Sequence, residues 1–334
     1  MSDSRDIILS VNDLSAGFER EGRILKAVDA VSFELKRGET LGVVGESGCG
    51  KGVTALSIMR LLPVPSGRYL GGSVMFNGTD ILSLPLAEMY KIRGNRISMI
   101  FQEPMTALNP VKKIGKQISE VFRIHKSGMT AGEMFTEARE LLLKVGISEP
   151  EQRMNEYPHQ LSGGMRQRVM IAMALACKPD ILIADEPTTA LDVTIQAQIL
   201  ELISSLQREY GMSVIFITHD LGVIANLCKD VVVMYAGKIA EKGSAKEIFY
   251  SPLHPYTRGL LDSVPRFDYK RKTKLKSIEG MVPSISEYPA GCRFRSRCEY
   301  AFNPCGISHP PESMVNPGHI VNCYRYGNSN GKTS

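Results

Sequence analysis

Apolar and polar positions alternate along the first part of the chain, as they do in half-buried strands. This alternation covers residues 8–14 and 28–35, with a turn near Arg20–Arg23 between them, and it predicts a pair of antiparallel strands. An apolar strand after Glu39 then enters a glycine-rich turn, and a helix is expected to continue from that turn to about Leu62.

Farther along, helical patterns alternate with short apolar runs. Residues 105–157 have a helical, lysine-rich pattern without a strong strand. Further helices are expected at Arg166–Cys177 and Thr194–Tyr210, and strands at Ile181–Ala184 and Ser213–Thr218. Strands that alternate with helices predict a parallel sheet, so the expected fold class is α/β. Beyond about Thr257, frequent prolines exclude long elements.

The composition is that of a globular protein with enough apolar material for a large core. The chain has 334 residues, 43% of them hydrophobic, and its 40 Lys and Arg exceed its 35 Asp and Glu by five. This balance excludes a disordered or fibrous chain. The excess is local: residues 270–332 carry a net charge of +6, and residues 1–269 carry −1. A nucleic-acid-binding face on the main body is therefore not expected.

No membrane span or secretion signal is expected from the pattern. The longest apolar run, Val169–Cys177, has nine residues, about half of the ~18 that a membrane-spanning helix needs. The first residues lack the basic flank and long apolar stretch of a signal peptide. A reducing, cytosolic location follows as an expectation, in which the seven cysteines would not form disulfides.

A phosphate-binding loop is predicted where the apolar strand after Glu39 turns into a helix. Gly45 and Gly50-Lys51 have the required spacing, in which backbone N–H groups and the lysine surround phosphates. A plain strand-to-helix turn is the alternative. The predicted nucleotide-binding residues of this segment are Gly45, Glu46, Ser47, Gly48, Cys49, Gly50, Lys51, Gly52, Val53 and Thr54.

One position departs from the pattern of such loops. The residue after the lysine is normally Ser or Thr, whose hydroxyl binds Mg²⁺, and here it is Gly52. Thr54 lies two residues farther along the helix, which turns its side chain about 200° away. We therefore expect either that water takes the ligand position or that metal binding is impaired.

Four further motifs follow in order, and together with the loop they resemble the ATPase subunits of ABC transporters over residues 6–260. They are Leu161-Ser-Gly-Gly-Met-Arg-Gln-Arg168, Ile181-Leu-Ile-Ala-Asp185-Glu186-Pro, Ala190-Leu-Asp192 and Ile217-Thr-His219-Asp. The segments at residues 101–110 and 157–160 resemble the dipeptide/oligopeptide and nickel importer branch. The resemblance implies a P-loop NTPase cassette with a RecA-like core, an antiparallel β subdomain, and a helical subdomain at about 105–160.

The resemblance also assigns roles in hydrolysis. Asp185 would hold Mg²⁺ through water, and Glu186 would take a proton from, or orient, the attacking water. Gln102 would reach the metal and the water and signal to the membrane partner, and His219 would contact the γ-phosphate. Without this context, each of these residues has an ordinary structural alternative, such as a helix cap or a loop side chain.

Further residues are assigned to nucleotide binding. Ser162, Gly163 and Gly164 precede a helix and would face the nucleotide of a second subunit, so that two ATP molecules lie at a dimer interface. Asp192 is grouped with them. Phe18 matches the aromatic residue that stacks on adenine in the family, although a core phenylalanine is an equal alternative.

Four cysteines in the proline-rich tail form a candidate metal site, namely Cys292, Cys298, Cys305 and Cys323. Their spacing lacks the close pair typical of zinc sites and differs from ferredoxin patterns. Similar tails in peptide-importer ATPases carry a [4Fe–4S] cluster, so the resemblance implies such a cluster, with zinc or free thiols as alternatives. Arg293, Arg295 and Arg297 are expected to offset the negative charge of the thiolates. Cys49, Cys177 and Cys228 are expected to be small apolar fillers.

The resulting hypothesis is an ATP-hydrolysing subunit of a membrane importer for di- and oligopeptides or a related small solute. It implies ATP and Mg²⁺, a homologous ATPase partner, identical or not, two membrane permease subunits, and indirectly a solute-binding protein, at the cytoplasmic membrane face. The cassette is expected at residues 1–260 and a cysteine-rich domain at 261–334. Two alternatives remain: a degenerate subunit that clamps ATP because of Gly52, and a soluble ABC ATPase acting on DNA or ribosomes.

Overall fold

The computed structural model describes residues 6–103, 107–189, 191–263 and 278–327, which divide into two compact units. The first unit comprises residues 1–36, 40–82 and 217–334, and the second comprises residues 37–39 and 83–216. The predicted division at about residue 260 lies inside the first unit and stays a prediction. Within the described ranges, no helix is long and apolar enough to cross a membrane.

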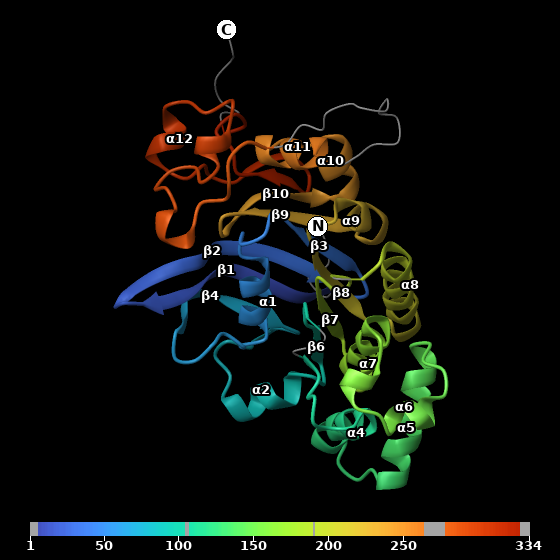
Figure 1. Ribbon diagram of the computed structural model, residues 1–334. Helices are drawn as coiled ribbons and strands as arrows, with labels where there is room; N and C mark the ends of the chain where they lie inside the picture. The colour runs from blue at the N-terminus through green and yellow to red at the C-terminus, as the bar shows by residue number, and fades with distance from the viewer. Residues whose placement is uncertain (1–5, 104–106, 190, 264–277, 328–334) are drawn as a thin grey trace. The chain divides into compact units, whose positions relative to one another are not determined.

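An antiparallel sheet lies in the first unit, drawn in blue to cyan in Figure 1. Its strand order is β2-β1-β4-β5, built from β1 (Ile7–Arg20), β2 (Arg23–Lys36), β4 (Gly67–Phe76) and β5 (Thr79–Asp80). The tight turn after Arg20 pairs it with Arg23, which confirms the predicted hairpin. Within β1, apolar side chains such as Leu9, Val11 and Leu14 are buried, whereas Asn12 and Asp13 are exposed.

The first unit also contains strands in the order β11-β12-β10-β9-β3. They are β3 (Thr40–Val44), β9 (Asp230–Tyr235), β10 (Lys238–Ser244), β11 (Ser313–Asn316) and β12 (His319–Val321). β3 runs parallel to β9, and the other neighbours are antiparallel. The tail therefore supplies two strands to a sheet of the cassette.

The described helices of the first unit are short. They are α1 (Lys51–Ile58), α9 (Leu221–Leu227), α10 (Ala245–Tyr250), α11 (Pro255–Asp262) and α12 (Pro304–Ile307), with single 3₁₀ turns η3 (Ile285–Glu287) and η4 (Arg295–Arg297). The prolines of the tail account for the brevity of its elements.

Helix α1 stops short of the predicted end near Leu62. Arg60 has a left-handed backbone with φ of 52°. Its N–H donates to the carbonyl of Ser57 at 3.0 Å, and the N–H of Leu61 donates to the carbonyl of Leu56 at 2.7 Å. These two bonds form a Schellman cap, which ends the helix although the residues that follow are still apolar.

The second unit combines parallel strands with a group of helices. β6 (Ile97–Ile100) pairs in parallel with β7 (Ile181–Asp185), and β8 (Ser213–Thr218) follows, with its last two residues in the first unit. The helices are α2 (Leu86–Ile92), α4 (Ile114–His125), α5 (Ala131–Lys144), α6 (Pro150–Met154), α7 (Gly163–Leu175) and α8 (Val193–Tyr210), with the 3₁₀ turn η2 (Pro158–Gln160). In this unit α4 to α7 pack on one another around residues such as Phe122 and Leu142. These elements confirm the predicted helical region and the predicted strands.

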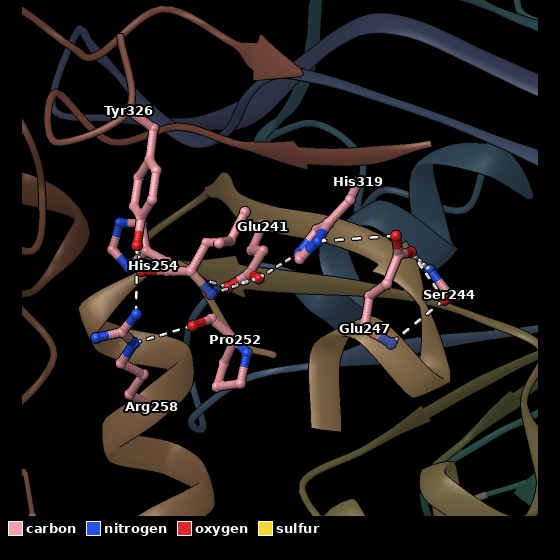
Figure 2. Close-up of polar contacts among 9 residues, drawn as sticks. Glu241, Ser244, Glu247, Pro252, His254, Arg258, His319 and Tyr326 are labelled. Atoms are coloured by element: carbon pink, nitrogen blue, oxygen red, sulfur yellow. Dashed lines mark hydrogen bonds and ion pairs between the residues drawn. The ribbon is translucent and has the colours of Figure 1, made fainter. Parts of the chain in front are cut away.

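A buried polar network holds the tail strand β12 to β10, and Figure 2 shows its side chains pointing toward one another. Glu241 is fully buried and accepts hydrogen bonds from the backbone N–H groups of Leu253 and His254, at 2.8 and 2.9 Å. The Nε2 of His319, also fully buried, lies 2.7 Å from Glu241 Oε1. Several partners thus satisfy a carboxylate that would be costly to bury alone.

His254 caps helix α11 in the same network. Its Nδ1 accepts a hydrogen bond from the backbone N–H of Tyr256 at 3.0 Å, and only an unprotonated Nδ1 can accept. Burial lowers the pKa of His254 to about 3, and that of His309 to about 4. Because the unfolded chain binds these protons near pH 6.5, folding stability present above that pH is lost as the pH falls toward 3.

We expect His254→Asn to flatten the pH dependence of stability, because asparagine keeps a cap acceptor without a titrating group. Between pH 6 and 4 the slope of the unfolding free energy should fall by about 1.4 kcal/mol per pH unit. Urea unfolding followed by far-UV circular dichroism at several pH values measures it. If the unfolding free energy depended on pH equally in the variant and the wild type, the lowered pKa of His254 would be contradicted.

Candidate functional site

The glycine-rich loop Gly45–Gly50 joins β3 to α1 in the first unit, as predicted. Gly45, Gly48 and Gly50 have positive φ angles of 152°, 78° and 104°, which side chains disfavour. A Cβ on Gly45 would lie 2.3 Å from the carbonyl oxygen of Met234. The loop is therefore fixed by close backbone packing as well as by its own conformation.

Lys51 is the first residue of α1 and lies folded against the loop. Its side chain is buried, and Nζ donates to the carbonyl oxygens of Gly45 at 2.7 Å and Glu46 at 3.0 Å. Cys49 is also buried, with its Sγ 3.8 Å from this ammonium, and burial raises its pKa. The burial of Cys49 agrees with the filler role expected for it. The burial of Lys51 places the lysine charge inside the loop.

Gly52 lacks the hydroxyl that normally follows the lysine, and the hydroxyl of Thr54 does not replace it. Thr54 is buried, and its Oγ1 donates to the carbonyl oxygen of Gly50 at 3.0 Å. Gly52 and Val53 form the half-buried start of α1, while Ser47 and Gly48 are exposed at the tip of the loop.

In the second unit the structure brings Gln102 and Glu186 together. Gln102 follows β6, Glu186 follows the adjacent strand β7, and Gln102 Nε2 donates to Glu186 Oε2 at 2.8 Å. Thr189 Oγ1 donates to the same oxygen at 2.9 Å. Glu186 also has a left-handed backbone with φ of 45°, a conformation that is enriched at functional sites. Asp185 ends β7 and is half-buried.

The motif before α7 lies at an exposed helix N-terminus. Ser162 caps the helix by accepting a hydrogen bond from the N–H of Met165 at 3.3 Å, and Ser162 and Gly163 are exposed while Gly164 is half-buried. The buried Gln167 donates through Nε2 to the carbonyl of Pro187. This contact ties α7 to the segment after Glu186, and nothing in the sequence pattern pointed to it.

The remaining predicted nucleotide residues lie at the ends of strands and helices. His219 is exposed directly after β8, in the first unit, and Asp192 caps α8 through a bond from the N–H of Ile195 at 3.0 Å. Phe18 is half-buried near the end of β1, opposite Leu25. Lys51 and His219 belong to the first unit and Asp185 to the second. The roles of these residues stay predictions.

The four tail cysteines line one small cavity in the first unit, together with His254 and Phe294. Burial raises the pKa of Cys292 to about 11 and also raises those of Cys298 and Cys323. Among the residues that the structure describes, no three or more His, Cys, Asp or Glu side chains are placed to hold a metal ion. The predicted iron–sulfur or zinc centre is therefore not confirmed.

The role expected for the tail arginines is wrong for two of the three. Arg293 bonds Asp29 at 2.6 Å and the carbonyl of Ala236, and Arg297 bonds Glu46. Only Arg295 of the three lines the cysteine cavity. Arg325, which the sequence reasoning missed, lines the cavity too and opposes the rise in the pKa of Cys298 and Cys323. Arg293 and Arg297 therefore pair with carboxylates elsewhere in the unit rather than with the cysteines.

Comparisons with known proteins identify the family. Residues 28–189 match the family described as ABC transporter, and residues 240–305 match the oligopeptide/dipeptide transporter, C-terminal region. A probable peptide ABC transporter ATP-binding protein of Sinorhizobium fredii is 52% identical over 320 residues, which cover 96% of this chain and 95% of that relative. This chain belongs to the ABC transporter family of ATP-binding proteins.

Other ABC transporter proteins agree with this placement. The dipeptide transport ATP-binding protein DppD of Bacillus subtilis is 52% identical over 95% of this chain and 94% of its own length. The oligopeptide transport ATP-binding protein OppD of Escherichia coli is 50% identical over 96% of this chain and 94% of its own length. An ABC transporter cassette solved as a dimer with ADP and phosphate has a TM-score of 0.63 at 28% identity, covering 71% of this chain and 98% of that one. The predicted fold class and the predicted ABC-type ATPase are confirmed.

We expect Gly45→Ala to destabilise the ABC cassette far more than Gly48→Ala. The added Cβ at Gly45 would overlap the carbonyl of Met234, whereas nothing lies within 4 Å of one at Gly48. Thermal unfolding should show a loss of at least about 3 kcal/mol for Gly45→Ala and of about 1 kcal/mol for Gly48→Ala, the cost of a left-handed alanine. Equal losses would contradict the close backbone packing.

Proposed function

We propose that this chain binds ATP at the loop Gly45–Thr54, hydrolyses it with Glu186, and thereby drives the import of peptides through partner membrane subunits. The hydrogen bond between Gln102 and Glu186 carries the catalytic part of the proposal. The similarity to peptide, dipeptide and oligopeptide transport proteins over nearly the whole chain supports the transport part.

The loop would bind the β- and γ-phosphates. Its positive-φ glycines allow successive backbone N–H groups to turn inward, and the N-terminus of α1 adds favourable partial charge. Lys51 supplies the full positive charge, and its contacts with two loop carbonyls hold it at the place where phosphate would arrive. Phe18 would stack on the adenine ring.

Glu186 would accept a proton from the attacking water. Gln102 and Thr189 both donate to Oε2, which fixes the orientation of the carboxylate. Because phosphoryl transfer is mainly a matter of positioning and charge, a base held in place by two hydrogen bonds suits the reaction. His219, exposed after β8, would contact the γ-phosphate.

The residues present fit a magnesium ion in part. Asp185 and Gln102 can supply oxygen ligands, which Mg²⁺ prefers, but Gly52 offers no hydroxyl and that of Thr54 is bonded to Gly50. Asp185 and Gln102 would hold the ion, with water in the position of the missing hydroxyl. The ion would neutralise charge on the β- and γ-phosphates.

Nucleotide would be shared between two ATPase subunits, identical or homologous. The exposed N-terminus of α7, with Ser162 and Gly163, is available to a phosphate of the partner's nucleotide. The dimeric cassette structure with ADP and phosphate supports this arrangement. Asp192 would lie at the same nucleotide.

The membrane subunits would dock on the helical part of the second unit, at the cytoplasmic membrane face. Apolar side chains there are well exposed, among them Val111, Ile124 and Tyr90, at 80%, 67% and 58%. Burial of such exposed apolar side chains against a protein partner would be favourable. Two permease subunits and, indirectly, a solute-binding protein complete the proposed importer.

Neither the fold nor the relatives favours the degenerate subunit or an ATPase acting on DNA or ribosomes.

The cysteine cavity is a second proposed site, for a [4Fe–4S] cluster, with zinc as the alternative. Four thiols that line one cavity match the donor set of such a cluster. Cys292, Cys298, Cys305 and Cys323 would hold it, and it would cross-link a tail that is built from short elements.

We expect Glu186→Gln to abolish hydrolysis while ATP binding persists, because glutamine cannot take a proton. In transporter assembled with its membrane subunits in liposomes, the ATPase rate should fall about 100-fold or more, and peptide uptake should stop. Glu201→Gln, an exposed glutamate of α8, is the matched control and should behave as the wild type.

If the wild-type transporter hydrolysed ATP no faster than Glu186→Gln, the proposal would be contradicted, and the alternative of a subunit that clamps ATP without hydrolysing it would be supported. A wild type that hydrolyses ATP but moves no peptide would contradict the transport part alone.

We expect protein purified without oxygen to contain about four iron and four sulfide per chain. Cys323→Ser should lose the iron, whereas Cys177→Ser, outside the cavity, should keep it. Elemental analysis and acid-labile sulfide assays measure both. Stoichiometric zinc without iron would establish the zinc alternative, and metal-free thiols would exclude both centres.

A further inference from the structure

The phosphate-binding loop carries a carboxylate that its proposed role does not explain. Glu46 is the second residue of the loop, directly after Gly45 and five positions before Lys51. Its side chain is 31% exposed. An uncompensated carboxylate at this place would repel the phosphates of ATP and weaken their attraction to the lysine.

Arg297, from the tail turn η4, pairs with this carboxylate through two parallel hydrogen bonds. Nη1 lies 2.6 Å from Oε2 of Glu46, and Nη2 lies 3.0 Å from Oε1. The arginine side chain is only 3% exposed. Such a bidentate, shielded pair is the strong form of an Arg–carboxylate contact, and it raises the pKa of Arg297 further.

The remaining donors of Arg297 are used as well, so the side chain has one fixed position. Nε donates to the carbonyl of Glu279 at 2.9 Å, Nη2 to that of Ile278 at 3.2 Å, and Nη1 to the hydroxyl of Tyr235 at 3.4 Å. A guanidinium with every nitrogen bonded is pre-organised for its partner.

Tyr256 holds the backbone of the same loop residue. The N–H of Glu46 donates to the Tyr256 hydroxyl at 2.8 Å. Tyr256 lies on α11, is fully buried, and packs against Tyr235 and Phe294. Both the side chain and the backbone of Glu46 are therefore held by residues from the C-terminal part of the chain.

The turn that carries Arg297 also carries two of the cavity cysteines. Cys292 and Cys298 bracket η4, and backbone bonds run from Arg295 to Cys292, from Arg297 to Phe294 and from Cys298 to Arg295. The tight turn fixes the position of the arginine relative to the cysteine cavity. Arg297 thus connects the tail to the loop, and the turn η4 holds this side chain in place.

We propose that Arg297 is a positioning residue for nucleotide binding, which neutralises and holds Glu46 so that the loop can accept a polyphosphate. ATP affinity then depends on the C-terminal tail, although the tail lies outside the sequence motifs of the cassette. This inference rests on the proposed role of Gly45–Thr54 as the phosphate-binding loop.

The test compares the wild-type full-length chain with Arg297→Gln, Glu46→Gln, and the double variant. Equilibrium binding of ATP with Mg²⁺ is measured for each, and KM and kcat are measured in the assembled transporter. We expect Arg297→Gln to weaken ATP binding about tenfold, as one unpaired charge near the site would, and to raise KM with kcat within about twofold. The double variant should bind ATP more tightly than Arg297→Gln, because the unpaired carboxylate charge is gone.

Lys242→Gln is the matched control. This substitution also removes one positive charge, but from a different contact with the tail, the ion pair of Lys242 and Glu312. It should leave ATP affinity unchanged. Circular dichroism establishes that each variant is folded. If Arg297→Gln does not fold, Arg297→Lys takes its place. Lysine cannot make the bidentate pair, so weaker ATP binding than in the wild type supports the proposal and unchanged binding overturns it.

Unchanged ATP affinity in folded Arg297→Gln, or a double variant that binds as weakly as that single variant, overturns the proposal. Equal weakening by Lys242→Gln overturns it too, since a general effect of tail contacts would then explain the loss. A wild-type chain that binds no ATP, like Lys51→Ala, overturns the proposed function itself and this inference with it.

Discussion

The close approach of three backbone segments around the glycine-rich loop is the constraint on which the rest of the first unit depends. Beside the contact of Gly45 with β9, a Cβ on Gly50 would lie 2.9 Å from the carbonyl of Ala27 in β2, and one on Gly237 would lie 2.4 Å from the same oxygen. The N–H of Gly237 donates to the carbonyl of Cys49 at 2.8 Å. Glycine is needed at each point because no side chain fits. The antiparallel sheet, the β9–β10 turn and the loop are thereby locked into one body.

Much of the fold could be predicted because local patterns determined it. The β1–β2 hairpin follows from alternation and a short turn, and the loop follows from glycine spacing ahead of a helix. The premature end of α1 could not be predicted, since Arg60 adopts a left-handed conformation that its residue type disfavours. The positions of Gln102 and Glu186 were available only through family resemblance, because their contact joins residues 84 positions apart.

The contacts that attach the tail were beyond sequence reasoning for a different reason. Charged side chains such as those of Glu241, Arg293 and Arg297 usually lie at the surface, so the sequence does not indicate their burial. Each is buried or nearly so, and each finds its partner far along the chain. Attributing the arginines to the cysteines was reasonable from their adjacency in sequence. In three dimensions a neighbouring residue can point the other way, and two of the three do.

The pairing of β12 with β10 also closes an open side of the sheet. Without the tail, β10 would be an edge strand with unpaired backbone N–H and C=O groups, the kind of surface that recruits strands from other chains. It would also contain the carboxylate of Glu241, deprived of His319. β11, short and followed by the turn at Gly318, is the edge in the intact unit. A cassette cut free of its tail is therefore expected to associate with itself rather than behave as an independent domain.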